Sequence, residues 1–117
     1  DIGSHKGETV ARYKELFSDS AIFCFEPFKD SAEILRARFS TDPSVNVFQN
    51  AVSDINGSKT FFVNDNDATN SLLPRSKDSR RYYSKAADTK CTVDVEAVPL
   101  DEMMLKNELD HLDILKF

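Results

Sequence analysis

Three stretches of this chain carry apolar residues at helical spacing. In residues 8–17, one face of the predicted helix collects four apolar side chains, Val10, Tyr13, Leu16 and Phe17. Residues 29–39 repeat the pattern with Ala32, Leu35 and Phe39, and we expect Asp30 or Ser31 to cap that helix. A shorter helix is predicted for residues 99–109, with Asp101 as its cap.

Between these helices lie short apolar runs that are rich in strand-forming residues. The runs at 20–26 and 44–52 alternate with the first two helices, which predicts parallel strands in a doubly wound α/β sheet. After the Asn56-Gly57 turn signal, residues 59–63 read as a strand that pairs antiparallel with residues 91–98. Residues 111–117 read as a last strand.

Composition restricts the class of protein. The 117 residues form one predicted domain, 1–117, with 40% apolar and 30% charged residues, which is typical of a globular protein. A net charge of −5 argues against nucleic acid as the main partner. We find no apolar run of membrane-spanning length and no signal-peptide pattern, so we expect a cytoplasmic protein. Its two cysteines, Cys24 and Cys91, are expected to be reduced packing residues without metal-ligand spacing.

The opening stretch "DIGSHKGE" has two glycines four residues apart, just before the first predicted helix. Glycine accepts positive φ and lets backbone approach a ligand. A phosphate-binding loop of the Walker type needs Lys-Ser/Thr after its last glycine, but Glu8 and Thr9 follow Gly7. A dinucleotide fingerprint needs glycine where this chain has His5, which disfavours that class and a nicotinamide-linked oxidoreductase with it.

A nucleoside ligand without phosphates is the remaining nucleotide-type interpretation. Glu26 lies nineteen residues after Gly7, at the end of the 20–26 run, where a carboxylate can accept hydrogen bonds from both ribose hydroxyls. S-adenosylmethionine (SAM) has the required chemistry: adenosine, a sulfonium and an amino acid. The spacing alone also fits an ordinary α/β connection, in which the glycines and the acid bind nothing.

Five blocks of the chain resemble the FkbM-type SAM-dependent methyltransferases: "DIGSHKGETV", "CFEPF", "NAVSD", "NSLL" and "LDEMM…HLDILKF". They occur in the family's order and cover essentially the whole chain. The resemblance implies a Rossmann-like class I methyltransferase fold that methylates a hydroxyl, often on a sugar or natural product. The alternative is a non-catalytic nucleoside-binding or interaction module that keeps this fold.

The resemblance also implies the cofactor-binding residues. Asp1 and Gly3 are expected against the methionine part of SAM, and Gly7 completes that wall. His5 is expected to be a wall residue rather than a catalytic base. Glu26 is expected at the ribose, and the adenine is expected beside four residues: Pro27, Phe28, Asn50 and Ala51.

Two departures from the family pattern concern the ends of the chain. The family's first strand should precede Asp1, and further strands should follow "DILK". The sequence therefore predicts a fragment truncated at both ends, with unpaired strand edges that favour homo-oligomers or aggregates.

The methyl acceptor and the catalytic base are less defined. His5, His111 and Asp113 are candidate bases, none within a recognisable motif, and His111 is expected to be structural. Residues 64–90 are polar and long enough for a functional loop. Its part from Arg75 to Lys90 has six basic residues against two acids, with Tyr82 and Tyr83 between them. This segment is either a solvated loop or a lid that recruits an anionic small-molecule acceptor.

Overall fold

The computed structural model describes residues 1–74 and 89–117. The chain divides into two compact units. The first comprises Asp1–Gly57 and Glu96–Phe117, and the second comprises Ser58–Val95. All predicted cofactor-binding residues belong to the first unit, while the described part of the polar loop belongs to the second.

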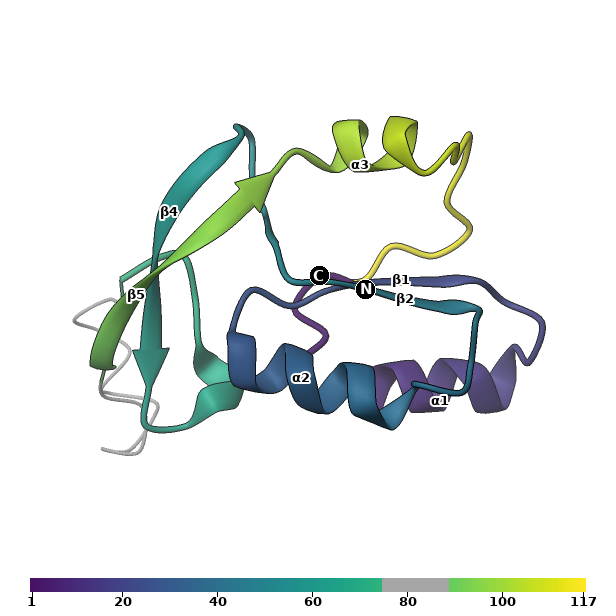
Figure 1. Cartoon of the computed structure of the whole chain (residues 1–117), viewed down its shortest axis with the longest axis horizontal. Helices are drawn as coiled ribbons and strands as arrows, with labels where there is room; N and C mark the ends of the chain where they lie inside the picture. The colour runs from purple at the N-terminus through teal and green to yellow at the C-terminus, as the bar shows by residue number, and fades with distance from the viewer. Residues whose placement is uncertain (75–88) are drawn as a thin grey trace. The chain divides into compact units, whose positions relative to one another are not determined.

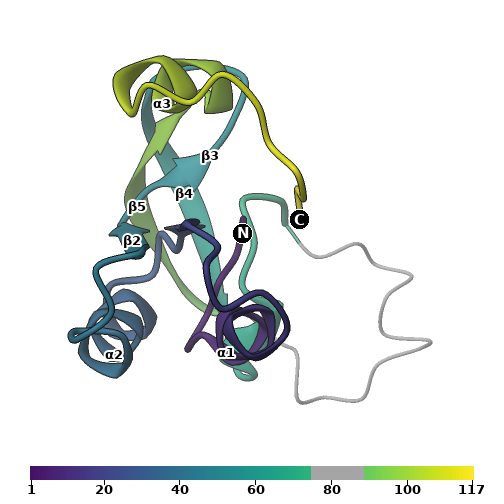
Figure 2. The same cartoon turned by 90° about the vertical axis from the view of Figure 1, so that its right-hand side faces the viewer.

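A pair of parallel strands forms the centre of the first unit. Strand β1 (Ile22–Phe25) pairs with β2 (Val45–Phe48), with Ile22 opposite Val45 and Phe25 opposite Phe48. Helices α1 (Glu8–Leu16) and α2 (Lys29–Arg38) lie together on one side of these strands, and α3 (Leu100–Lys106) lies on the other (Figures 1 and 2). The strand–helix–strand alternation and its parallel pairing are confirmed.

The hydrophobic core of this unit forms where the apolar faces of α1 and α2 meet β1. Val10, Cys24 and Leu35 are fully buried, and Ile22 is 7% exposed. Burial raises the pKa of the Cys24 thiol, against a smaller opposing effect of a hydrogen bond with Ser4. Cys24 is thus a protonated core residue, as expected, whereas Cys91 is exposed and does not pack.

Two residues at the end of the first predicted helix are more exposed than their spacing suggested. Leu16 and Phe17 are 56% and 48% exposed, and Phe17 lies beyond the last helical residue as its C-cap. The core takes only Val10 and the half-buried Tyr13 from the apolar face of this helix.

The predicted helix caps are wrong. The N-cap residues of α1, α2 and α3 are Gly7, Phe28 and Pro99, and none of them makes a side-chain cap hydrogen bond. Asp30 and Asp101 lie instead within the first helical turns, where their charge favours the helix dipole. Ser31, the other candidate, is 1% exposed and packs inside the unit.

The predicted strand at 44–52 is two strands. After β2 the chain leaves the β1 edge, and β3 (Ala51–Val52) pairs in parallel with the end of β5 (Thr89–Val98). Ala51 lies opposite Ala97 and Val52 opposite Val98. The two residues between β2 and β3, Gln49 and Asn50, mark this change of partner.

Strands β4 (Gly57–Asn64) and β5 are neighbours, and they run in opposite directions through the second unit (Figure 1), as predicted. A 3₁₀ turn, Asp67–Thr69, follows β4. Asn64 joins the strands through its side chain, which accepts a 2.9 Å hydrogen bond from the Thr89 hydroxyl.

Parallel and antiparallel strand pairs therefore occur together in a small α/β protein. None of the helices in residues 1–74 and 89–117 combines the length and apolar character needed to cross a membrane.

Residues 111–117 do not form the predicted strand. One backbone hydrogen bond ties this segment to the start of the chain, from the Ile2 N–H to the Lys116 carbonyl at 2.9 Å. A strand requires a continuous ladder of such bonds with a neighbour, and the single bond does not provide one. Ile114 and Leu115 consequently remain about half exposed, at 52% and 45%.

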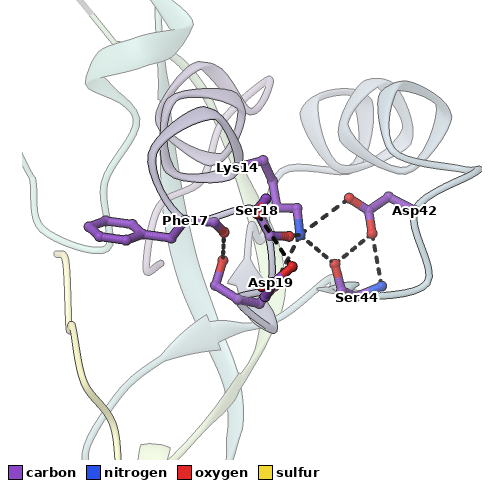
Figure 3. Close-up of polar contacts among 7 residues, drawn as sticks. Lys14, Phe17, Ser18, Asp19, Asp42 and Ser44 are labelled. Carbon is purple, nitrogen blue, oxygen red and sulfur yellow. Dashed lines mark hydrogen bonds and ion pairs between the residues drawn. The ribbon is translucent and has the colours of Figure 1, made fainter.

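A lysine network ties α1 to the loops that flank β1 and β2 (Figure 3). The Lys14 ammonium donates to the Ser18 and Ser20 carbonyls at 2.6 and 3.1 Å and to the Ser44 hydroxyl at 2.8 Å. It also pairs with Asp42 at 3.6 Å. Two hydrogen bonds from Ser44 are the main reason that the pKa of Asp42 is lowered. The network fixes the entry of β2 beside β1.

Candidate functional site

The candidate site lies where the carboxyl ends of β1 and β2 meet the opening turn of the chain. Glu26 follows β1 directly and is 6% exposed. Its backbone N–H donates to the Phe48 carbonyl at 3.0 Å, so the parallel pairing continues through this residue. The end of a parallel sheet is where α/β proteins most often bind ligands.

The Glu26 carboxylate joins two backbone segments. One oxygen accepts a hydrogen bond from the His5 N–H at 2.8 Å, and the other accepts one from the Phe28 N–H at 2.9 Å. Each carboxylate oxygen has two lone pairs, so both oxygens retain capacity for one further donor. Glu26 therefore holds the opening turn and the start of α2 together and can still accept two hydrogen bonds from a ligand.

The opening turn runs alongside the end of β1. The Phe25 N–H donates to the Asp1 carbonyl and the Gly3 N–H donates to the Phe25 carbonyl, both at 2.9 Å. The turn then passes through three left-handed residues, with φ of 72° at Gly3, 49° at His5 and 85° at Gly7. This backbone path brings Asp1, Gly3 and His5 to the same strand end as Glu26.

The two glycines of the turn have different surroundings. A Cβ at Gly7 would lie 2.6 Å from Leu35 Cδ1 and 2.7 Å from Phe39 Cε2, so this glycine permits α1 to start close against α2. A Cβ at Gly3 would meet nothing within 4 Å. The first glycine thus borders open space, and the second serves packing within the unit.

Asp1 is a buried acid at the start of the turn. Its side chain is 1% exposed, and neither carboxylate oxygen accepts a hydrogen bond from any described residue. The Lys116 ammonium lies 3.2 Å from Oδ1. Ser4, which the sequence analysis did not select, donates from its hydroxyl to the Asp1 carbonyl at 2.8 Å and is 3% exposed.

The residues expected at the adenine lie on two connections. Pro27 and Phe28 are half-buried between β1 and α2, and Phe28 belongs to the Glu26 hydrogen-bond group. Asn50 is half-buried between β2 and β3, while Ala51 is 4% exposed and paired within β3. The structure therefore brings the turn, Glu26 and Phe28 together by direct hydrogen bonds, with Asn50 and Ala51 on the neighbouring strand connection.

The candidate catalytic bases lie in different environments. His5 is 24% exposed, with Nδ1 3.7 Å from a Glu8 carboxylate oxygen. The His111 and Asp113 side chains are 72% and 92% exposed. A hydrogen bond from the His111 ring to the Asp110 carboxylate, together with the charge of that carboxylate, raises the pKa of His111. His111 is thus an exposed imidazole beside two acids, Asp110 and Asp113.

A cavity of about 450 Å³ lies within the first unit, lined by residues of β1, α3 and the segment 108–116 together with the end of α1. Its lining is mainly apolar and includes Phe17, Phe23, Met103 and Leu112. Of the nine predicted cofactor-binding residues, Asp1 alone is among the residues that line it. Lys116 lines it as well, so the cavity borders the ion pair of Asp1 and Lys116, whereas Glu26 does not line it.

The basic segment from Arg75 onward lies outside the described residues, apart from its last two residues, Thr89 and Lys90. The Lys90 ammonium pairs with an Asp65 carboxylate oxygen at 3.6 Å. In the described part of the chain, no group of three His, Cys, Asp or Glu side chains is arranged to hold a metal ion.

One protein-family model matches the chain over its whole length. A model described as the methyltransferase FkbM domain matches residues 1–117, and the chain therefore belongs to this family. The match confirms the resemblance seen in the sequence blocks and supports a methyltransferase function. No curated protein and no solved structure matches the chain significantly.

Proposed function

We propose that this member of the FkbM methyltransferase family uses SAM to methylate a hydroxyl group on a small molecule such as a sugar or natural product. The observation that carries the proposal is the Glu26 group: a buried carboxylate at the end of β1 that binds the N–H groups of His5 and Phe28. In this proposal the domain has the Rossmann-like, doubly wound fold expected from the sequence.

The residues present fit the proposed cofactor. The free lone pairs of Glu26 suit the two ribose hydroxyls, and the open space at Gly3 suits a ligand in contact with backbone. The Asp1 carboxylate, which accepts no hydrogen bond from a described residue, suits the ammonium group of the methionine part. Phe28 and Asn50 provide the sides on which the adenine would lie.

Bound SAM supplies a methyl group on a sulfonium, which makes that carbon electrophilic. The protein contributes mainly by holding the acceptor oxygen in line with the methyl carbon, and such positioning can account for about 7–11 kcal/mol in model reactions. A base within hydrogen-bond reach would assist a hydroxyl nucleophile. We assign His5 to the cofactor wall, since its N–H is bound to Glu26.

A second candidate function is a nucleoside-binding module without catalysis. The high exposure of His111 and Asp113 favours it, because both side chains are mostly in contact with solvent. The two functions differ in turnover and share the binding site.

The test is calorimetric titration of S-adenosylhomocysteine into the intact protein and its Glu26→Gln variant. Gln keeps one acceptor oxygen and loses the charge, so binding should weaken by about 1.5–3 kcal/mol. Glu33→Gln is the matched control, since Glu33 is 60% exposed on α2 and pairs with Lys29 at 3.8 Å. Unchanged affinity in Glu26→Gln would refute the assignment of the ribose site. Binding without methyl transfer to any hydroxyl acceptor would favour the second function.

A further inference from the structure

We infer that Lys116 is a positioning residue for the amino-acid end of the cofactor, acting through Asp1 and the opening turn. The inference rests on the proposed function and assigns a role to a residue at the other end of the chain. Lys116 comes 115 positions after Asp1 in the sequence, and both belong to the first unit.

One ammonium group reaches three oxygens of the turn. Lys116 Nζ lies 3.2 Å from Asp1 Oδ1, 3.3 Å from the Gly3 carbonyl and 3.5 Å from the Ile2 carbonyl. The ammonium donates hydrogen bonds to the two carbonyls and forms an ion pair, without a hydrogen bond, with the Asp1 carboxylate. The backbone of Lys116 is anchored as well, because its carbonyl accepts the Ile2 N–H at 2.9 Å.

The burial of Asp1 makes this partner necessary. With 1% of its side chain exposed, Asp1 cannot rely on water to compensate its charge. Burying a carboxylate without a partner is costly, and an ion pair with additional hydrogen bonds reduces that cost. Lys116 is the ion-pair partner that the described chain provides for Asp1.

The ion pair between Lys116 and Asp1 leaves one carboxylate oxygen of Asp1 able to accept a hydrogen bond from a ligand. Lys116 approaches Oδ1, whereas Asp1 Oδ2 is buried and accepts no hydrogen bond from the described residues. A ligand ammonium group can supply that missing donor. The Lys116 contact with the Gly3 carbonyl also fixes the turn at the glycine where the ligand would contact backbone. Lys116 thus orients the carboxylate and the turn without touching the reacting atoms.

Measuring the binding of two ligands distinguishes this positioning role of Lys116 from a purely structural one. S-adenosylhomocysteine has the amino-acid group, whereas 5′-methylthioadenosine has the same adenosine without it. We expect Lys116→Met to weaken S-adenosylhomocysteine binding about tenfold or more, the range for hydrogen bonds to charged groups. Methylthioadenosine should bind the variant as it binds the unsubstituted protein. Lys116→Arg, which retains the charge, should recover most of the lost affinity.

Lys106→Met is the matched control, because Lys106 is exposed in the last turn of α3. Asp1→Asn provides a second variant that preserves shape and should show the same selective loss. Equal weakening of both ligands in Lys116→Met and Asp1→Asn, or unchanged S-adenosylhomocysteine binding, would overturn the inference. If neither ligand binds the unsubstituted protein, the proposed function itself fails.

Discussion

Gly7→Ala should destabilise the protein far more than Gly3→Ala, although both glycines have positive φ. A non-glycine residue in the left-handed region costs about 1–2 kcal/mol, and this applies at φ of 85° and of 72° alike. At Gly7 the new Cβ would also lie 2.6 Å from Leu35 Cδ1 and 2.7 Å from Phe39 Cε2.

Leu35 is fully buried, so it cannot move aside without disturbing the core. Overpacking of this kind costs about 1–3 kcal/mol. The two effects together predict a loss of about 2–5 kcal/mol for Gly7→Ala, against about 1–2 kcal/mol for Gly3→Ala. The free energy of unfolding of a folded domain is typically about 5–15 kcal/mol. The loss predicted for Gly7→Ala is therefore a large fraction of it.

Urea unfolding of both variants, followed by circular dichroism, measures the two free energies. The same samples should be titrated with S-adenosylhomocysteine, together with Gly3→Val. That variant should lose binding while its helices remain, because its branched side chain enters the open space beside the turn. Equal destabilisation by the two alanines would refute the packing role of Gly7. Normal binding by Gly3→Val would refute the ligand role of Gly3.

Three further predictions concern groups outside the ligand site. Lys14→Met should lower the free energy of unfolding by about 1.5–3 kcal/mol, since three acceptors lose a charged donor; a smaller loss in urea unfolding would count against the network. His111 should titrate above its ordinary pKa of 6.5 in an NMR pH series and move back towards it in Asp110→Asn. Its contribution to stability should therefore be present below pH 6.5 and disappear as the pH rises through the folded-state pKa. A thiol reagent should label the exposed Cys91 in the folded protein and reach the buried Cys24 only on unfolding, and simultaneous labelling of both would contradict the assigned burial.

Local patterns predicted the elements that bury their own apolar face. Strand β1 and helix α2 follow directly from the apolar run at 20–26 and from the spacing of Ala32 and Leu35. The break between β2 and β3 could not be predicted in this way. It exists because β2 pairs with β1 whereas Ala51, in β3, pairs with Ala97, a residue far along the chain. An apolar run shows that a segment is buried, but it does not show which strand pairs with it.

The candidate site, like the fold, could be predicted from the sequence only in part. Glu26 and the glycine turn carry motifs that can be recognised in sequence, and the structure joins them through the His5 N–H. Lys116 has no such signal, because its contacts with Asp1 and Gly3 depend on how the two ends of the chain meet. The packing role of Gly7 could not be predicted from the sequence either, since glycine before a helix indicates a turn and does not identify Leu35 as its neighbour.

The measurement that tests the account most directly is a crystal structure of the protein with S-adenosylhomocysteine. We expect the ribose hydroxyls to donate to Glu26, the amino-acid group to lie at Asp1 and Gly3, and Lys116 to keep its contact with Asp1. A ligand seated instead in the apolar cavity beside Phe17 and Met103, with Glu26 bound only to backbone, would contradict it.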